Sequence, residues 1–179
     1  MATVRILLGI VWFAAIGSGW GVGSGVVNKE HTTRVIEFAR SQIWVKETSE
    51  NSSPEIDRYN AYAGVKAAPW CASFVSYCFG KAGFAQPRTA WSPSLFPKDR
   101  LVKNPQAGMV LGVYFPELKR IAHCALVEGV KGNWVIAIEG NSNADGSREG
   151  NGVYRKIRHV RTIYRYADWI KNNKKGGLP

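Results

Sequence analysis

The amino-acid sequence predicts an α+β fold, in which helices come first and an antiparallel sheet follows. Up to residue 83 the apolar residues recur at helical spacing, whereas from residue 108 they recur with a period of two. Helical and strand-like runs that are grouped rather than alternating favour α+β over α/β. The 179 residues, 45% of them hydrophobic, suffice for one full core and are too few for two ordinary domains.

The first thirty residues differ from the rest. The run from Ile6 to Val27 carries no charge, follows Arg5 and becomes rich in glycine and serine. This layout favours a cleaved secretory signal peptide, with an uncleaved membrane anchor as the alternative. Either way we expect export to the periplasm, the cell envelope or the extracellular space. The chain then divides into a signal or anchor segment (1–29), a folded domain (30–170) and a basic tail (171–179).

Three helices are expected in the first half. The first follows a threonine cap at the start of TTRVIEFARSQIWVKE (residues 32–47). The second has Ser53 at its cap position, Pro54 as its first residue and Gly64 as a stop. The third, within APWCASFVSYCFGKAG (residues 68–83), is apolar nearly all round and should be buried.

The second half begins with an irregular, proline-rich connection and continues as strands. Residues 84–108 contain four prolines, and ordered connections of this length are usually functional. The strand-like runs that follow are GMVLGVYF (108–115), IAHCALVEGV (121–130), NWVIAIEGN (133–141) and GVYRKIRHV (152–160). Consecutive strands joined by short turns predict an antiparallel meander.

Cys71 is a candidate nucleophile because of its place at the head of the third helix. Free backbone N–H groups and the helix dipole favour a thiolate there. A cysteine in so apolar a helix is more often a small core residue, and a lone strand histidine is more often structural. The combination of Cys71 with a histidine and a carboxylate favours the catalytic interpretation.

His123 and Glu139 lie on neighbouring predicted strands. If those strands pair so that Val127 faces Val135, His123 faces Glu139, and the even spacing puts both on one face. Glu139 or Asn141 would then hold one imidazole nitrogen, while the other nitrogen addresses the sulfur of the nucleophile.

The segments PWCASFVSYCF, IAHCALVEGV and VIAIEGNSN, in that order, resemble the motifs of the CHAP family. These amidase and peptidase domains belong to the larger NlpC/P60 group of papain-like cysteine hydrolases. The resemblance covers most of the chain and implies a nucleophile helix packed on an antiparallel sheet. It also implies that Cys71 is the nucleophile, His123 the general base and Glu139 the residue that orients the histidine, with Asn141 completing the polar cluster.

The same resemblance implies cleavage of amide bonds in peptidoglycan, by an N-acetylmuramoyl-L-alanine amidase or an endopeptidase. The formal net charge of +11 favours attraction to anionic envelope polymers, while nucleic acid is not an expected partner. The basic residues of the last third form either such a binding surface or a merely solvated face. We expect a monomer that needs no cofactor. The alternatives are a non-catalytic envelope-binding protein of the same fold and an amidase that acts on another peptide-like substrate.

Three departures from the family pattern affect the site. Trp70 replaces a glutamine that can stabilise an oxyanion, so the backbone N–H of Cys71 is the one donor predicted, and Trp70 itself is expected to line the cleft and pack a substrate. Cys124 follows His123, and a second thiol beside the base invites oxidative pairing. No acid occurs in AYAGVKAAPW (residues 61–70), so no calcium site is expected. Trp91, Trp134 and Trp169 are predicted to be core residues or groove walls.

Overall fold

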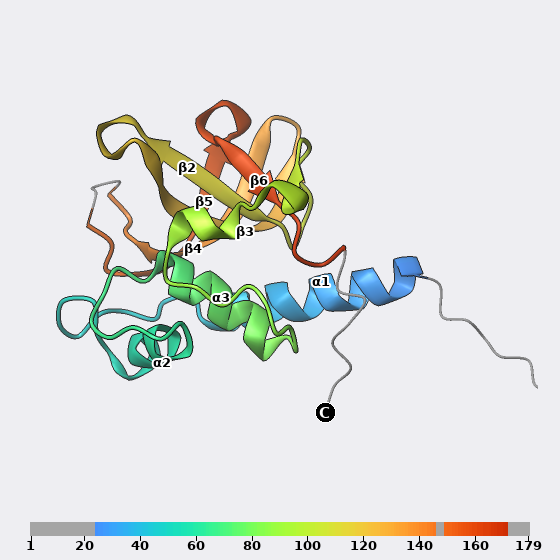
Figure 1. The fold of residues 1–179 in the computed structure, drawn as a ribbon. Helices are drawn as coiled ribbons and strands as arrows, with labels where there is room; N and C mark the ends of the chain where they lie inside the picture. Colours follow the sequence, from blue (N-terminus) through green and yellow to red (C-terminus); the bar gives the residue numbers. More distant parts are fainter. Residues whose placement is uncertain (1–23, 146–148, 172–179) are drawn as a thin grey trace, which may run out of the picture.

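In residues 24–145 and 149–171, which the computed structural model describes, a six-stranded antiparallel sheet carries three α-helices on one side (Figure 1). The helices are α1 (Ser24–Ser41), α2 (Pro54–Tyr62) and α3 (Cys71–Lys81). The strands are β1 (Leu101–Val102), β2 (Val110–Phe115), β3 (Arg120–Lys131), β4 (Trp134–Ser142), β5 (Gly152–His159) and β6 (Arg165–Ala167). This is the α+β architecture that the order of helical and strand-like runs predicts.

The first helix begins earlier than predicted. A threonine cap is expected near residue 32, but α1 starts at Ser24 and continues through that position. The hydroxyl of Thr33 donates to the carbonyl of Lys29 (3.0 Å), one turn back in the same helix, and therefore caps no backbone N–H. The boundary predicted between residues 29 and 30 falls inside α1.

The predicted signal or anchor segment lies mostly outside the described residues, which begin at residue 24. Among the residues that are described, no helix combines the length and the apolar character needed to cross a bilayer.

The other two helices form where the sequence predicts them. Ser53 caps α2, with its Oγ accepting from the backbone N–H of Ile56 (3.4 Å). Gly80 lies within α3, and a Cβ at this position would come within 2.5 Å of the Tyr62 side chain. The missing side chain lets α2 pack closely against α3. Gly83, with a φ of +93°, follows the end of the helix.

The four predicted strands form the meander β2–β5, and two short strands complete the sheet. The strand order is β1-β6-β2-β3-β4-β5. After β5 the chain returns, so that β6 lies between β1 and β2. β1 and β6 have two and three residues, too few for a period-two pattern to be recognised in the sequence.

The register between β3 and β4 corrects the predicted one. Val127 pairs with Ala137 rather than with Val135, because the strands continue to Lys131 and Trp134, which pair across a two-residue turn. That turn alone would place Val127 opposite Ile138, and a bulge between Val127 and Gly129, which adds one residue to β3, moves its partner to Ala137. Beyond the bulge, Val130 takes Val135 as its partner. The pairing of Val127 differs from the prediction by two residues, and a shift of two at this end of the hairpin keeps His123 and Glu139 on one face.

Buried apolar side chains occupy both faces of the sheet. The larger cluster joins the helices to the sheet and includes Phe74 of α3 and Leu126 and Ile138 of the strands. The smaller cluster lies on the other face and includes Leu111 and Val127. Cys71 lies at the N-terminal end of α3, where the helix meets the strands.

Candidate active site

The start of α3 is fixed by the chain that leads into it. Asn60 of α2 is fully buried, and its amide donates to the carbonyl of Ala68 (3.0 Å). Trp70 packs against Tyr59 and Phe74, with ring centroids 5.9 and 6.5 Å away. Its indole N–H donates to Glu47 (2.8 Å).

These contacts correct the role predicted for Trp70. Its side chain is 0% exposed, so no surface is left for a substrate to touch. The indole is an internal support for the turn that presents Cys71, because burial and the hydrogen bond to Glu47 hold it in one position.

Asn141 ties β4 to the same turn. Its backbone has a φ of +52°, and its side chain reaches the residue before Cys71. With its amide oriented so that both ends have partners, the oxygen accepts from the backbone N–H of Trp70 and the nitrogen donates to the carbonyl of Gly150, each at 3.3 Å. A Cβ on Gly150 would come within 2.0 Å of the Asn141 backbone, so this close approach requires glycine. Asn141 thus positions the start of α3.

The imidazole of His123 meets the carboxylate of Glu139 across β3 and β4. Nε2 of His123 lies 2.9 Å from Oε2 of Glu139. In the observed register Glu139 is a diagonal neighbour of His123 rather than its direct partner, and the shared face still brings the two together. Since Nε2 is engaged by Glu139, Nδ1 is the ring nitrogen left for the sulfur.

A second cation holds the buried carboxylate. Arg158 of β5 donates to both oxygens of Glu139, at 2.5 and 2.8 Å. The hydroxyl of Ser142 donates to Oε2 (3.2 Å). Burial alone would raise the pKa of Glu139, but the hydrogen bonds from Arg158 and His123 outweigh it and hold the pKa at about 2. Glu139, although 0% exposed, is therefore ionised.

The thiol of Cys71 lies among polar groups. The hydroxyl of Ser92, on the short helix η1 (Ser92–Leu95), is 3.4 Å from its sulfur. The Cys124 thiol, which donates to the same hydroxyl (3.9 Å), and the His123 imidazole also act on the Cys71 thiol. The hydrogen bond from Cys124 is the largest influence on the pKa of Cys71; burial opposes it, and His123 and Ser92 add to it. Together they hold that pKa well below its usual range.

The pKa of His123 moves in the opposite direction. Burial alone would lower it, but hydrogen bonds to Cys71 and Glu139 raise it to about 9. A lowered thiol pKa next to a raised imidazole pKa makes the thiolate and the imidazolium the stable pair near neutral pH. Such a pair is a nucleophile with its proton donor already in place.

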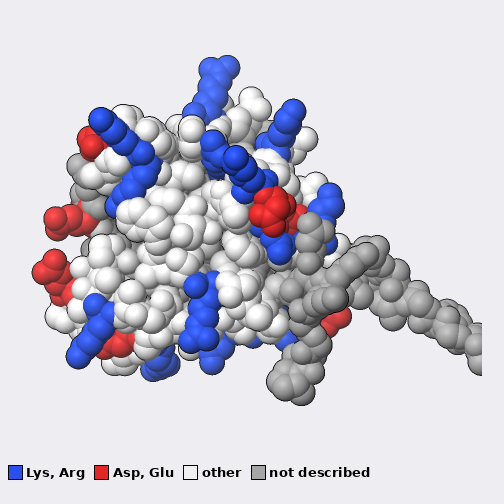
Figure 2. All heavy atoms as spheres, in the orientation of Figure 1, with Lys and Arg blue, Asp and Glu red and all other residues white. Residues whose placement is uncertain are grey.

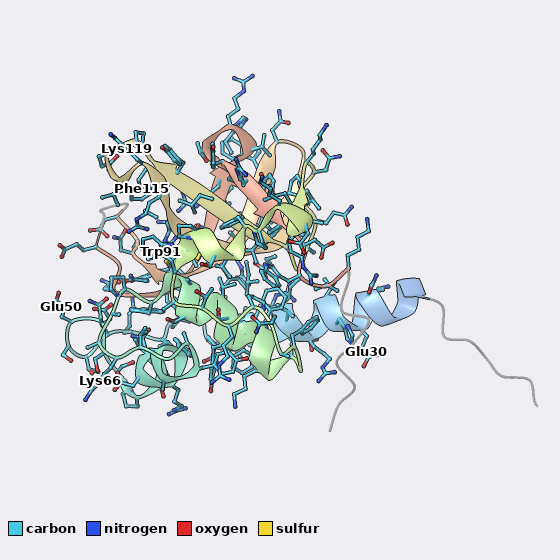
Figure 3. The ribbon with its side chains drawn as sticks, viewed as in Figure 1. Glu30, Glu50, Lys66, Trp91, Phe115 and Lys119 are labelled. Atoms are coloured by element: carbon cyan, nitrogen blue, oxygen red, sulfur yellow. The ribbon has the colours of Figure 1, made fainter. Side chains whose placement is uncertain are left out.

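Cys71, His123 and Asn141 line one open cavity of about 350 Å³. Cys71 is only 5% exposed, but that exposure faces the cavity. One wall comes from the β2–β3 hairpin and includes Phe115 and Arg120. In Figure 3, Phe115 and Trp91 lie on the sheet side of the edge where α3 begins, and Glu50 lies on the helix side.

The structure thus brings Cys71, His123, Glu139 and Asn141 together as the sequence predicts, and it adds Ser92, Ser142 and Arg158. Ser92 carries no recognisable signal, because it lies in the irregular connection. Glu139 pairs with Tyr154 of β5, and Arg158 follows Tyr154 by four residues. This even spacing puts Arg158 on the same face as Glu139, but it can be recognised only once the register is known. In the sequence Arg158 is one of a basic run, of which Arg155 also proves to be paired, with Glu128 (2.6 Å). In the described part of the chain, no group of three or more metal-binding side chains occurs.

Comparisons with solved structures identify the same fold. The peptidoglycan hydrolase RipB from Mycobacterium tuberculosis superposes with a TM-score of 0.51 at 18% identity, over 80% of this chain and 66% of that one. The P60 domain of an antigen from M. avium paratuberculosis superposes with a TM-score of 0.50 at 12% identity, over 79% and 94%. No protein-family model and no curated protein sequence matches the chain. At these identities the likeness establishes a P60-type α+β fold.

Proposed function

We propose that this protein is a cysteine-dependent hydrolase that cleaves amide bonds in peptidoglycan, as an N-acetylmuramoyl-L-alanine amidase or an endopeptidase. The observation that carries the proposal is a thiol with a lowered pKa and an imidazole with a raised pKa in one open cavity, with the imidazole held by an ionised carboxylate at 2.9 Å.

The proposed mechanism has two halves. The thiolate of Cys71 attacks the scissile carbonyl and forms a C–S bond, while the backbone N–H of Cys71, the first of α3, stabilises the oxyanion. As the C–N bond breaks, the imidazolium of His123 gives its proton to the leaving amine and becomes neutral. His123 then takes a proton from water, whose oxygen attacks the thioester, and the carboxylic acid leaves with the thiolate restored.

Glu139 and Asn141 act as positioning residues in this mechanism. Glu139 fixes the ring of His123 and stabilises its positive charge, and Asn141 holds the backbone ahead of the nucleophile through Trp70. Arg158 keeps Glu139 ionised throughout, because its guanidinium is bidentate on the carboxylate.

We propose peptidoglycan as the substrate on the basis of the fold and the sequence motifs. RipB, which superposes on this chain, is described as a peptidoglycan hydrolase. The narrower assignment to the CHAP family stays a prediction that rests on the Trp-Cys-Ala and Glu-Gly-Asn motifs. Export to the envelope belongs to the same proposal, and the net charge of +11 would draw the protein to anionic wall polymers.

Digestion of purified sacculi tests the proposal. The wild-type protein should release soluble fragments, and mass spectrometry of their new termini distinguishes an amidase from an endopeptidase. Cys71→Ala should lower the rate at least about 1,000-fold, since the nucleophile is lost. Cys78→Ala, which removes a buried thiol of the same helix, is the matched control and should retain activity. Undiminished digestion by Cys71→Ala would refute the mechanism, and binding to sacculi without cleavage would identify a non-catalytic envelope-binding protein.

A further inference from the structure

One wall of the catalytic cavity carries a cation that the mechanism does not use. Arg120 is the first residue of β3, three positions before His123, and lines the same cavity as Cys71. A ligand that fills a cavity of about 350 Å³ therefore meets both the sulfur and this side chain.

The guanidinium of Arg120 lies over the ring of Trp91 and uses one of its nitrogens in a hydrogen bond within the protein. Its carbon lies 4.3 Å from the centre of the Trp91 ring, and Nη1 donates to the carbonyl of Ile121 (3.2 Å). Trp91 is 51% exposed and directly precedes Ser92, which contacts the sulfur of Cys71. Stacking restricts the side chain while it leaves several N–H groups at the edge of the guanidinium for a ligand.

Arg120 also differs from the arginines that are held by carboxylates. Arg155 pairs with Glu128 and Arg158 with Glu139. Within residues 24–145 and 149–171, Arg120 makes no such ion pair. An arginine that is ordered on an aromatic ring, partly exposed and without an acidic partner suits a planar anion such as a carboxylate.

The opposite wall of the cavity is acidic. Glu47 and Glu50, from the connection between α1 and α2 on the helix side, line it. Figure 2 shows acidic side chains along the left edge of this face, the edge on which Figure 3 places Glu50. A substrate carboxylate is repelled from that wall and attracted to Arg120, so the charges set the direction in which a peptide lies across the sulfur.

We propose that Arg120, stacked on Trp91, is a specificity-determining residue that binds a carboxylate of the substrate close to the scissile amide. The inference rests on the proposed function and narrows it to peptides that carry a free carboxylate at that position. Substrates in which this group is a neutral carboxamide are then poor ones.

Sacculi with and without free carboxyl groups test this subsite. One half of a preparation is treated with carbodiimide and ammonium chloride, which converts exposed carboxylates to carboxamides, and the other half is mock-treated. The wild-type protein should digest the amidated sacculi at least about 10-fold more slowly. Arg120→Gln should digest both preparations at similar, lowered rates, while Arg120→Lys should restore part of the preference. The matched control is Arg165→Gln, because Arg165 also stacks on an aromatic ring (5.0 Å) but lies on β6, outside the cavity lining.

Binding provides a readout that needs no catalysis. Soluble fragments released by lysozyme from the two preparations are titrated into Cys71→Ala and into Cys71→Ala/Arg120→Gln, with tryptophan fluorescence as the signal. Preference for the carboxylate form in the first variant and its loss in the second support the subsite. Equal preference in both variants, or no preference in either, overturns it. If fragments bind in this way but wild-type protein cleaves nothing, the proposed hydrolase function fails while the carboxylate subsite stands.

Discussion

The first turn and the last turns of α3 each carry a cysteine, and the two thiols have opposite properties. Cys71 and Cys78 are both buried and unpaired, and both belong to the same larger core cluster. Burial raises the pKa of Cys78 well above its usual value, whereas the pKa of Cys71 lies well below it. Burial by itself therefore does not decide the ionisation of a thiol. The groups that face Cys71, and its place at the start of the helix, reverse what burial would impose.

The largest expected difference between Cys71 and Cys78 is in the rate at which their thiols are alkylated. At neutral pH, iodoacetamide should alkylate Cys71 at least about 1,000-fold faster than Cys78, because Cys71 is ionised and faces a cavity while Cys78 is neutral and enclosed. Mass spectrometry of peptides from timed samples measures both rates in one experiment. Similar rates for the two cysteines would contradict the assignment of Cys71 as a thiolate.

Removing the imidazole should make Cys71 behave more like Cys78. His123→Ala deletes both the hydrogen bond and the positive charge that favour the thiolate, so alkylation of Cys71 at pH 7 should slow by roughly 10- to 100-fold. His159→Ala is the control, because His159 packs edge-on against Trp134 (5.0 Å), outside the cavity lining. An unchanged alkylation rate in His123→Ala would mean that Cys124, Ser92 and the helix start ionise the thiol without the imidazole.

Glu139→Gln should lower the upper pH limit of activity. The thiolate and imidazolium coexist above the pKa of Cys71 and below that of His123, which is about 9. Loss of the carboxylate lowers the pKa of His123, so the basic limb of the kcat/KM profile should move down by about one pH unit. Glu128→Gln, which removes a carboxylate that pairs with Arg40 and Arg155, should leave that limb in place. A basic limb unmoved by Glu139→Gln would separate Glu139 from the titration of His123.

A smaller effect is expected at Cys124, the second thiol beside Cys71. Cys124 makes the largest single contribution to the lowered pKa of Cys71, but His123→Ala removes two contributions, a hydrogen bond and a charge, whereas Cys124→Ala removes one. The hydrogen bond from Cys124 favours the thiolate of Cys71, so Cys124→Ala should slow alkylation of Cys71 at pH 6 by about 5-fold, the worth of one ordinary hydrogen bond. Cys124→Ser retains a donor of similar size and should recover most of the rate. Equal rates in wild type and Cys124→Ala would remove Cys124 from the set of groups that stabilise the thiolate.

Most of the fold follows from the sequence, and the exceptions have physical causes. The α2 cap at Ser53 and the meander from β2 to β5 are confirmed because capping and period-two patterns act locally. The start of α1 and the strands β1 and β6 are missed. The start of α1 is missed because the sequence does not distinguish a threonine inside a helix from a threonine at its cap. The strands β1 and β6 are missed because two or three residues are too few to show a period of two.

The site divides in the same way. Even spacing places His123 and Glu139 on one face. The two-residue turn shifts the predicted register by three residues and the bulge in β3 takes one of them back, so the net shift is even and the shared face is kept. Ser92 and Arg158 reach the site only through tertiary packing, so no local signal marks them. Trp70 is adjacent to Cys71 in sequence but is fully buried against Tyr59 and Phe74, and no local pattern reveals those tertiary contacts.

Strand β4 carries both Glu139, which grips the imidazole, and Asn141, which anchors the backbone just ahead of the sulfur. The positions of the imidazole and of the thiol therefore both depend on one short segment of β4. A one-residue insertion between Glu139 and Asn141 would dislocate both at once. Lengthening the tight turn at Gly132, at the far end of the same hairpin, should disturb neither, which makes that turn a suitable point for grafting a foreign targeting module.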